Sequence, residues 1–538
     1  MKSPSSMKCV QRVFLAFAAI SGLLLLAACG SSSGTAPNNN GFNATFLNGT
    51  YVFSTTGKDT SGNGTLIALA GAISANGNGG ITAGTMDIID PSVGVDAGES
   101  ITSGSYSVSS DGRGQIKLAT AVGNFVLDFV LTTSPAPSTH GLVSEFDTNG
   151  TGSGTIDLQT APSGQSALAG PFAFSLAGQG SNGEPFTSAG AFTLSSSGTS
   201  TAGVADFNRS STPLLNNSLS VSAILGSGTA PGTATFGSAY NGTFDFYPID
   251  STHWKMIETD TNYYLAGDVY TQTGFTTIPS GTLVFTLGGT TASAQFIAAG
   301  GLMTSDGTGN FPSGSEDVNI NGAATASLPF VGTASGAAGT GGRVQVGLSG
   351  FNPSILWVVY PSSGGVLIMV ADTSGVINGT ALAQTATALN APDAYGLNLT
   401  GVNASSFVDS IAQFNTTSAT SNNMSGILDE NDQGTLYLGG TLTGTYTPDS
   451  PATGRGNISA SSNAGFQGGF TLEYYAFDAS DALFIDVDTQ QVAVGTIAGQ
   501  SGVTPSANAI PAHQLETVVH PLFRATQSKK LKGSFQLH

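Results

Sequence analysis

Hydrophobic positions alternate with polar ones in short runs along the body of the chain, and glycine-rich turns such as Gly62-Asn63-Gly64 separate the runs. Successive side chains of a strand point to opposite faces, so this alternation is typical of strands with one buried face. In the first 160 residues the pattern predicts strands near 50–56, 65–74, 80–89, 103–109, 114–121, 124–132, 141–146 and 154–159.

The same pattern occurs four times, with a period of about 112 residues. In every copy an aspartate is followed seven residues later by glycine and twelve residues later by glutamine: Asp147, Gly154 and Gln159; Asp260, Gly267 and Gln272; Asp372, Gly379 and Gln384; Asp488, Gly495 and Gln500. A Gly-x-x-Asp motif lies upstream in each copy and ends in Asp87, Asp206, Asp317 and Asp429. We expect these repeated residues to be structural, because turns and strand ends favour such residue types at fixed positions.

The repeats predict an all-β protein with four tandem antiparallel domains of about eight strands each, because one repeat is long enough to bury its own core. The domains are expected at 46–161, 166–274, 278–385 and 390–502. An up-and-down barrel is favoured, and a β-sandwich is the alternative. The opening strand, a glycine followed by aromatic residues two apart, is similar to that of small avidin-like or lipocalin-like barrels, a generic resemblance that implies no ligand residues. The short connections predict touching domains in a semi-rigid string.

The N-terminal segment has the features of a targeting signal. Residues 1–28 combine a basic start with an apolar run too short to be a dedicated membrane span, and the run ends in Leu26-Ala27-Ala28-Cys29. This motif resembles the lipobox of bacterial lipoproteins, which implies cleavage before Cys29, lipid attachment to its side chain, and outer-membrane or surface placement because Gly30 follows it. The alternative is an ordinary cleaved signal peptide. Residues 29–45 are predicted to be a flexible tether.

Composition excludes some functions. The chain has 14 lysines and arginines against 33 aspartates and glutamates, with a net charge of −19. Phosphate binding depends on clustered basic residues, so nucleic acid is not expected as a partner. The two cysteines, Cys9 and Cys29, leave the mature chain without a disulfide. A basic tail at 503–538 is interpreted as solvated, with contact to an anionic surface or the acidic body as the alternative.

Paired acids are the first candidate for catalysis. Glu145 with Asp147, Glu258 with Asp260, and Asp486 with Asp488 stand two apart, and two carboxylates on one face can hydrolyse glycosides. The third copy has Val370 instead, and each shared aspartate precedes threonine, as in a turn. A structural turn is therefore favoured.

Histidine, calcium and arginine give three weaker signals. His140 and His253 occupy a position that other copies fill with Gly365 and Asp481, which favours turn residues. The segment 429–434 is rich in oxygen ligands, so calcium is an alternative, but it has Gly440 where an EF-hand has glutamate, and we predict no metal site or cofactor. Arginines follow glycine at one repeat position, with threonine in the second copy: Arg113, Arg343, Arg455 and Thr233. A salt bridge to the repeat aspartates is favoured over a carboxylate or sugar clamp.

These observations predict a non-catalytic envelope lipoprotein that acts as a binding or structural module, with the membrane and possible polysaccharide or envelope components as partners. Aromatic faces recognise sugars, so the candidate contact residues are Trp254, Tyr263, Tyr264, Trp357 and Tyr360. The alternatives are a purely structural stalk and a glycosidase working through Glu258 and Asp260.

Overall fold

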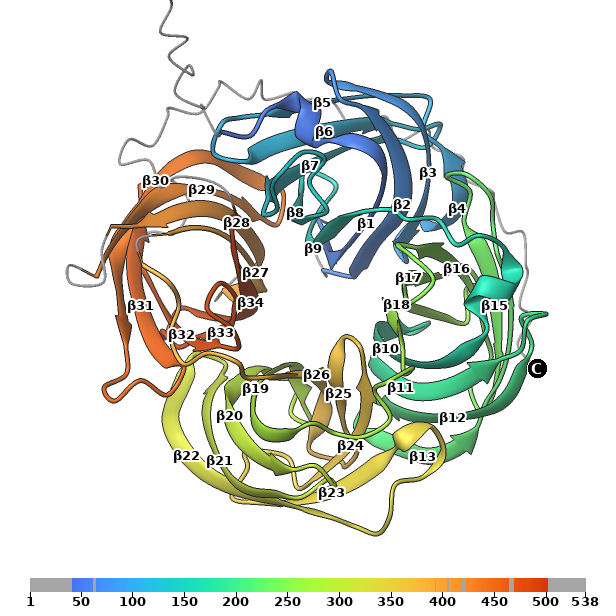
Figure 1. Cartoon of the computed structure of the whole chain (residues 1–538), viewed down its shortest axis with the longest axis vertical. Helices are drawn as coiled ribbons and strands as arrows, with labels where there is room; N and C mark the ends of the chain where they lie inside the picture. The colour runs from blue at the N-terminus through green and yellow to red at the C-terminus, as the bar shows by residue number, and fades with distance from the viewer. Residues whose placement is uncertain are drawn as a thin grey trace, which may run out of the picture. The chain divides into compact units, whose positions relative to one another are not determined.

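The computed structural model describes residues 41–60, 64–391, 393–403, 406–417, 422–463 and 469–501. The predicted lipobox, most of the tether and the basic tail lie outside these residues. Within them the chain is built from antiparallel strands and three short 3-10 helices: η1 (Ala44–Phe46), η2 (Gln165–Leu168) and η3 (Thr340–Gly342) (Figure 1). None of the described helices is long and apolar enough to cross a membrane.

The first barrel contains nine strands: β1 (Asn48–Asp59), β2 (Leu66–Asn76), β3 (Gly80–Asp90), β4 (Gly94–Ser100), β5 (Ser103–Val108), β6 (Arg113–Ala119), β7 (Asn124–Leu131), β8 (His140–Phe146) and β9 (Gly150–Leu158). They pair in the order β2-β1-β9-β8-β7-β6-β5-β3-β4, and an additional β2–β3 pairing closes the barrel.

The second barrel also has nine strands: β10 (Gly170–Gly180), β11 (Pro185–Leu194), β12 (Ser200–Arg209), β13 (Thr212–Ser218), β14 (Ser220–Ile224), β15 (Gly232–Gly237), β16 (Gly242–Pro248), β17 (His253–Glu258) and β18 (Tyr263–Thr271). This sheet runs from β13 to β14, and a single bridge connects Thr199, which directly precedes β12, with Ser222 of β14.

The third and fourth barrels are closed and have eight strands each. The third contains β19 (Ser280–Thr291), β20 (Phe296–Asp306), β21 (Phe311–Ile320), β22 (Ala323–Ala334), β23 (Val344–Ser349), β24 (Leu356–Ser362), β25 (Gly365–Val370) and β26 (Gly375–Ala383). The fourth contains β27 (Ala394–Asn403), β28 (Phe407–Thr416), β29 (Asn423–Asp432), β30 (Thr435–Pro448), β31 (Arg455–Ser462), β32 (Phe470–Ala476), β33 (Ala482–Asp486) and β34 (Gln491–Gly499).

Each barrel encloses its own apolar core, and the alternate residues that open each repeat point into it: Tyr51 and Phe53, Phe172 and Phe174, Leu283 and Phe285, and Tyr395 and Leu397. The repeat glycine lies where the last strand meets the first. A Cβ atom on Gly154 would lie 1.8 Å from the Ser54 carbonyl oxygen, and one on Gly379 would lie 2.0 Å from that of Thr286. A side chain there would therefore force the closing strands apart.

The prediction of four tandem barrels of antiparallel strands is confirmed, in preference to the sandwich. One strand of the first barrel was not expected from the sequence. The residues of β4 are exposed or half-buried along its whole length, so β4 lacks the apolar alternation that marks the other strands.

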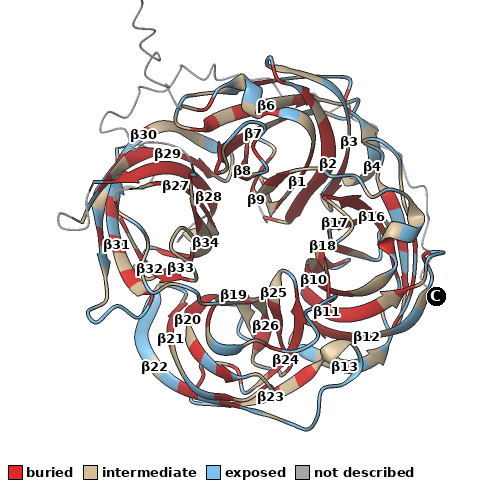
Figure 2. Ribbon diagram, viewed as in Figure 1, coloured by how far each residue is buried: buried red, intermediate tan, exposed pale blue. Residues whose placement is uncertain are grey.

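The barrels also contact one another. Figure 2 shows buried residues along β1, β2 and β28, whereas β22 is largely exposed and β30 is mostly half-buried or exposed. The inner strands are buried on both faces, because one face packs against a neighbouring barrel. Beyond the three consecutive pairs, the fourth barrel binds the first, with Thr151 of β9 donating to Asp409 of β28. The contacts therefore close a cycle of four junctions, which differs from the open string expected from the sequence.

Candidate functional site

The Gly-x-x-Asp aspartates lie at the junctions between barrels. At the second junction Asp206 is fully buried and receives two hydrogen bonds from Arg343 of the third barrel, 2.6 Å from Nε to Oδ2 and 2.8 Å from Nη2 to Oδ1. The Tyr360 hydroxyl also donates to Oδ2. Burial, reinforced by the carboxylate, raises the pKa of Tyr360 well above its ordinary value, so its proton stays in the bond.

The third junction repeats this geometry with a second acid. Arg455 donates to Asp317 from Nε at 2.8 Å and from Nη2 at 3.1 Å, and the Tyr475 hydroxyl donates to Asp317 at 2.6 Å. Glu473 lies 3.1 Å from Arg455 Nη2. Arg455 and Tyr475 are cross-strand neighbours on β31 and β32, so the sheet itself brings the cation and the phenol together.

The fourth junction has a looser version. Arg113 Nη1 lies 3.6 Å from Asp429, while its Nε binds Asp111 at 2.9 Å. Its cross-strand neighbour is Val130, where the third junction has a tyrosine. The predicted arginine salt bridges therefore exist, but each joins an arginine of one barrel to an aspartate of the barrel before it in the cycle.

Asparagines two residues after these aspartates form a second set of links. The Asn319 amide donates to the carbonyl oxygens of Asp486, Asp488 and Gln491 in the fourth barrel, at 2.9, 3.1 and 2.8 Å. Asn208 and Asn431 make the same three-carbonyl contact at the second and fourth junctions. One amide thus satisfies three backbone acceptors of a neighbouring turn.

The repeat glutamines form a third set. The Nε2 atoms of three of them each bind two carbonyl oxygens of the following barrel, one in a turn and one at a strand end: Gln272 binds Gly341 and Pro361, Gln384 binds Thr453 and Ala476, and Gln500 binds Asp111 and Leu131. Each turn carbonyl lies two residues before the junction arginine. The glutamine therefore fixes the turn from which that arginine extends.

The first junction departs from all three patterns. Asp87 faces Asp245 and Tyr247 of the second barrel, and burial together with Asp245 raises the pKa of Asp87 to about 7. The ladder pairs Gly232 with Phe246, so Pro231 stands beside Tyr247 at the arginine position. This corrects the sequence alignment, which placed Thr233 there. The asparagine position holds Ile89, which packs in an apolar cluster with Tyr247.

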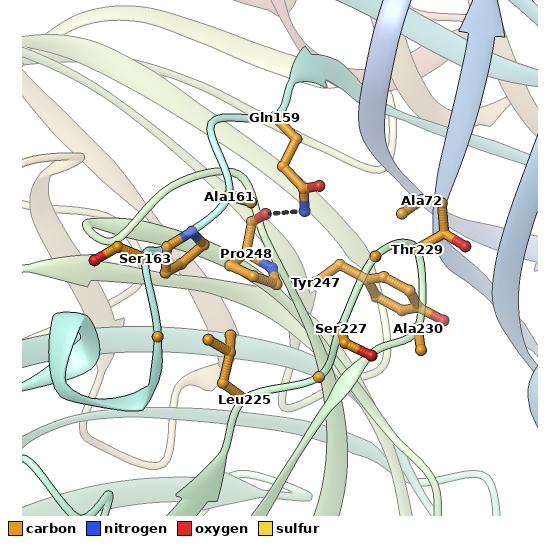
Figure 3. A pocket seen from close by; sticks show the side chains of 14 residues that line it. Ala72, Gln159, Ala161, Ser163, Leu225, Ser227, Thr229, Ala230, Tyr247 and Pro248 are labelled. Atoms are coloured by element: carbon orange, nitrogen blue, oxygen red, sulfur yellow. Dashed lines mark hydrogen bonds between the residues drawn. The ribbon is translucent and has the colours of Figure 1, made fainter.

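A cavity of about 260 Å³ lies at this junction. Figure 3 shows Tyr247, Ala72 and the loop residues Ser227 and Thr229 around it, with Gln159 hydrogen-bonded to Pro248 at its edge. Gln159 makes this one carbonyl contact, at 2.7 Å, where the other repeat glutamines make two.

The aromatic residues predicted to contact sugar are not gathered on one surface. Trp254 and Trp357 are 1% and 0% exposed and lie in the cores of the second and third barrels. Tyr264 packs in the apolar cluster of the first junction, Tyr360 binds Asp206, and Tyr263 packs edge-on against Phe186. Four of these five residues are buried, and Tyr263 is half-buried.

The paired acids also have structural surroundings: they are buried or bonded to the backbone of turns. Glu258 is 1% exposed, and burial with the nearby Asp260 raises its pKa to about 9. Asp260 accepts the N–H groups of Thr243 and Asn262 at 2.7 and 2.8 Å. Each of the other three repeat aspartates also accepts a backbone N–H two residues along its own turn: Asp147, Asp372 and Asp488. The two carboxylates of a pair therefore do not converge on open space.

The two histidines and the calcium candidate segment are likewise engaged in contacts with other protein side chains and backbone groups. His140 and His253 each bind an aspartate on the adjacent strand, at 2.6 and 2.7 Å. In segment 429–434, Asp429 faces Arg113 and Asn431 binds the first barrel. No group of three or more His, Cys, Asp or Glu side chains suited to a metal occurs in the part of the chain that the structure describes.

The comparisons with known proteins name no family. No family model and no curated protein matches the chain. One solved structure, a mutant of the vaccine antigen Transferrin Binding Protein B from Haemophilus parasuis, is similar at 9% identity over 70% of this chain and 86% of that chain, with a TM-score of 0.18. A likeness of this degree carries no argument about function.

Sequence reasoning missed the junction asparagines and tyrosines. The asparagines had a visible signal, because asparagine follows the motif aspartate by two residues in three copies while Ile89 stands in the first. The tyrosines had a weaker signal, since Tyr360 stands in an apolar run and Tyr475 directly follows the core residue Tyr474, so each interface tyrosine looks like a core residue in the sequence.

Proposed function

We propose that this chain is a lipid-anchored, non-catalytic module of the cell envelope that holds four barrels in a fixed cycle and presents their outer surface to a binding partner. The observation that supports it most strongly is the use of the repeated polar residues. Asp, Arg, Asn and Gln recur at fixed positions because they join one barrel to the next.

The chemistry of the buried groups supports a binding or structural role rather than catalysis. Glu145 and Glu258, the acids of two candidate pairs, are almost wholly buried, and burial raises the pKa of each. With a pKa of about 9, Glu258 stays protonated at neutral pH and supplies no nucleophile or base there, and the burial of both glutamates leaves them out of reach of a substrate. Polysaccharide or another envelope component remains our candidate partner, since the outer strands expose polar, weakly charged surfaces.

The anchor is tested by labelling cells with radioactive palmitate. Cys29→Ser should abolish incorporation and release the protein from membranes, whereas Cys9→Ser should change neither, because only Cys29 occupies the lipobox position. Equal labelling of both variants would overturn the lipid anchor.

The binding role is tested on the full chain carrying Cys29→Ser, which should lack the lipid. A ligand that binds only the folded state must raise the thermal unfolding midpoint in a concentration-dependent way. We expect such a shift with soluble envelope polysaccharides or cell-wall fragments. No shift across the panel would favour the structural stalk.

A further inference from the structure

The first junction has the acids and the tyrosine found at the third junction but lacks the arginine that they bind there. At the third junction the acids Asp317 and Glu473 and the tyrosine Tyr475 surround Arg455, and the partly exposed Asp449 lies 3.4 Å from its Nη1 atom. At the first junction Asp87, Asp245 and Tyr247 stand at the matching positions, with Asp245 two residues before the tyrosine as Glu473 is. Pro231 replaces the arginine, and a proline side chain carries no charge or donor.

The cavity lies where the arginine-bearing turn lies at the second junction. There Gly341 approaches Ala191 so closely that a Cβ atom on the glycine would be 2.2 Å from the alanine methyl. Ala72 is the counterpart of Ala191, since each stands two positions along its strand from the residue paired with the motif aspartate. At the first junction Ala72 instead borders empty space.

The polar groups beside the cavity lack the arginine partner that the matching groups have at the other junctions. Tyr247 lines the cavity and is 1% exposed; Asp87, which Tyr247 faces, is 0% exposed and is not itself a lining residue. Tyr247 and Asp245 both face Asp87, but neither the Tyr247 hydroxyl nor Asp87 Oδ2 makes a hydrogen bond of ordinary geometry among the described residues, whereas the matching atoms at the second and third junctions do. A guanidinium that enters beside them would supply charged donors to these acceptors.

We propose that the first junction is a binding site for a guanidinium group, which enters the cavity and takes the place of the missing arginine beside Asp87, Asp245 and Tyr247. The cavity of about 260 Å³ is smaller than the pockets of drug-sized ligands, which span about 300–1,000 Å³, and suits a single side chain. A planar guanidinium matches a carboxylate through two parallel hydrogen bonds, which an ammonium group does not. This site goes beyond the proposed function and does not depend on the lipid anchor.

The test is calorimetric titration of the full Cys29→Ser chain at pH 8 with ethylguanidinium, and with ethylurea as its neutral counterpart. We expect saturable 1:1 binding of ethylguanidinium and none of ethylurea. A blocked Gly-Arg-Gly peptide separates the two sources of the group: tighter binding of the peptide assigns the site to an arginine of a partner protein, and binding of the free cation alone assigns it to a small guanidinium compound. Failure of both cations to bind would overturn the proposal.

Variants locate the site. Pro231→Arg should supply the cation internally and abolish binding, while Pro231→Ala keeps the vacancy and should bind as the parent does. Asp87→Asn should weaken binding about tenfold or more, because it removes a charged acceptor. Unchanged affinity in both Pro231→Arg and Asp87→Asn would overturn the assignment, and the Asp87 variant keeps the test decisive if the arginine variant does not fold.

The second junction offers a gain of function. Arg343→Ala creates the same vacancy beside Asp206 and Tyr360, so this variant should bind a second equivalent of ethylguanidinium and recover part of its lost thermal stability. Stoichiometry that stays at one would contradict the equivalence of the two sites.

Discussion

The first and third junctions join barrels of the same fold by different chemistry. The third is polar, because Arg455 pairs with Asp317 and the Asn319 amide binds three carbonyls of the fourth barrel. The first has Pro231 and Ile89 at those two positions and buries a cluster of eleven apolar residues, where the cluster of the third junction has five buried residues. The repeat thus tolerates the loss of its polar links where apolar burial replaces them.

The two kinds of junction contribute differently: polar links fix how two barrels are oriented, and apolar burial holds them together. Buried apolar area stabilises contact but is non-directional, whereas an arginine paired with a buried carboxylate fixes both position and orientation. The three polar junctions therefore define the geometry of the cycle. The first junction is held by apolar contacts that lie beside the cavity. The predictions below act on this contrast.

The largest effect is expected from removing a junction cation. Arg343→Met leaves the buried carboxylate of Asp206 without its partner, and breaking a buried pair in this way costs about 3–5 kcal/mol. The measurement is the free energy of unfolding in urea. Pro231→Met at the first junction is the matched control and should cost far less. Equal losses would show that the arginines contribute no more than the residue that replaces them.

The second prediction concerns pH. The pKa of Asp87 rises from 3.8 to about 7 through burial and Asp245, with Tyr247 the other group that faces it. The folded state therefore binds more protons than the unfolded state between these values. The stability from this group is complete below pH 3.8 and is lost as the pH rises through 7, a change of at most about 4 kcal/mol.

Urea unfolding from pH 4 to pH 8 measures this decline. In Pro231→Arg the new cation favours the charged carboxylate, so the decline should become shallower. A slope that is the same in the parent and in Pro231→Arg would contradict the assignment of the proton to this junction.

The fold was predictable because it is encoded in short-range patterns. A period of two marks each strand, and the repeat shows that four units share one topology. The junctions were harder, because their partners are far apart in the chain: Arg343 and Asp206 are separated by 137 residues. The sequence showed that both residue types recur, but it did not show which copy of one meets which copy of the other.

The candidate sugar-binding residues illustrate a related limit. Trp254 and Trp357 are the only tryptophans of the chain, and this rarity drew attention to them. Trp357 stands in a continuous apolar run, and the strand of Trp254 is buried on both faces although Lys255 and Glu258 interrupt it, so periodicity did not distinguish a core face from an interface face. The structure places both in cores, and the polar residues that link the barrels are smaller and more regularly spaced.

The third prediction tests the asparagine links. Asn319→Leu keeps the approximate size of the side chain but leaves three buried carbonyl oxygens without their shared donor, so we expect a loss of about 2–3 kcal/mol. At the first junction, Ile89→Leu changes only the shape of an apolar side chain and should cost less than about 1.5 kcal/mol. Thermal unfolding of the two variants compares the effects. A larger loss for Ile89→Leu would reverse our ranking of the two junctions.

The smallest effect concerns the repeat glutamines. Gln384 makes two carbonyl contacts and Gln159 makes one, and a typical hydrogen bond contributes about 1 kcal/mol, so Gln384→Ala should cost about twice as much as Gln159→Ala. The comparison sharpens in the Pro231→Arg background. If an arginine draws the turn into the cavity, Gln159 gains the second carbonyl, and Gln159→Ala should then cost as much as Gln384→Ala. A coupling energy of zero between positions 159 and 231 would show that the turn is held open for a reason other than the missing cation.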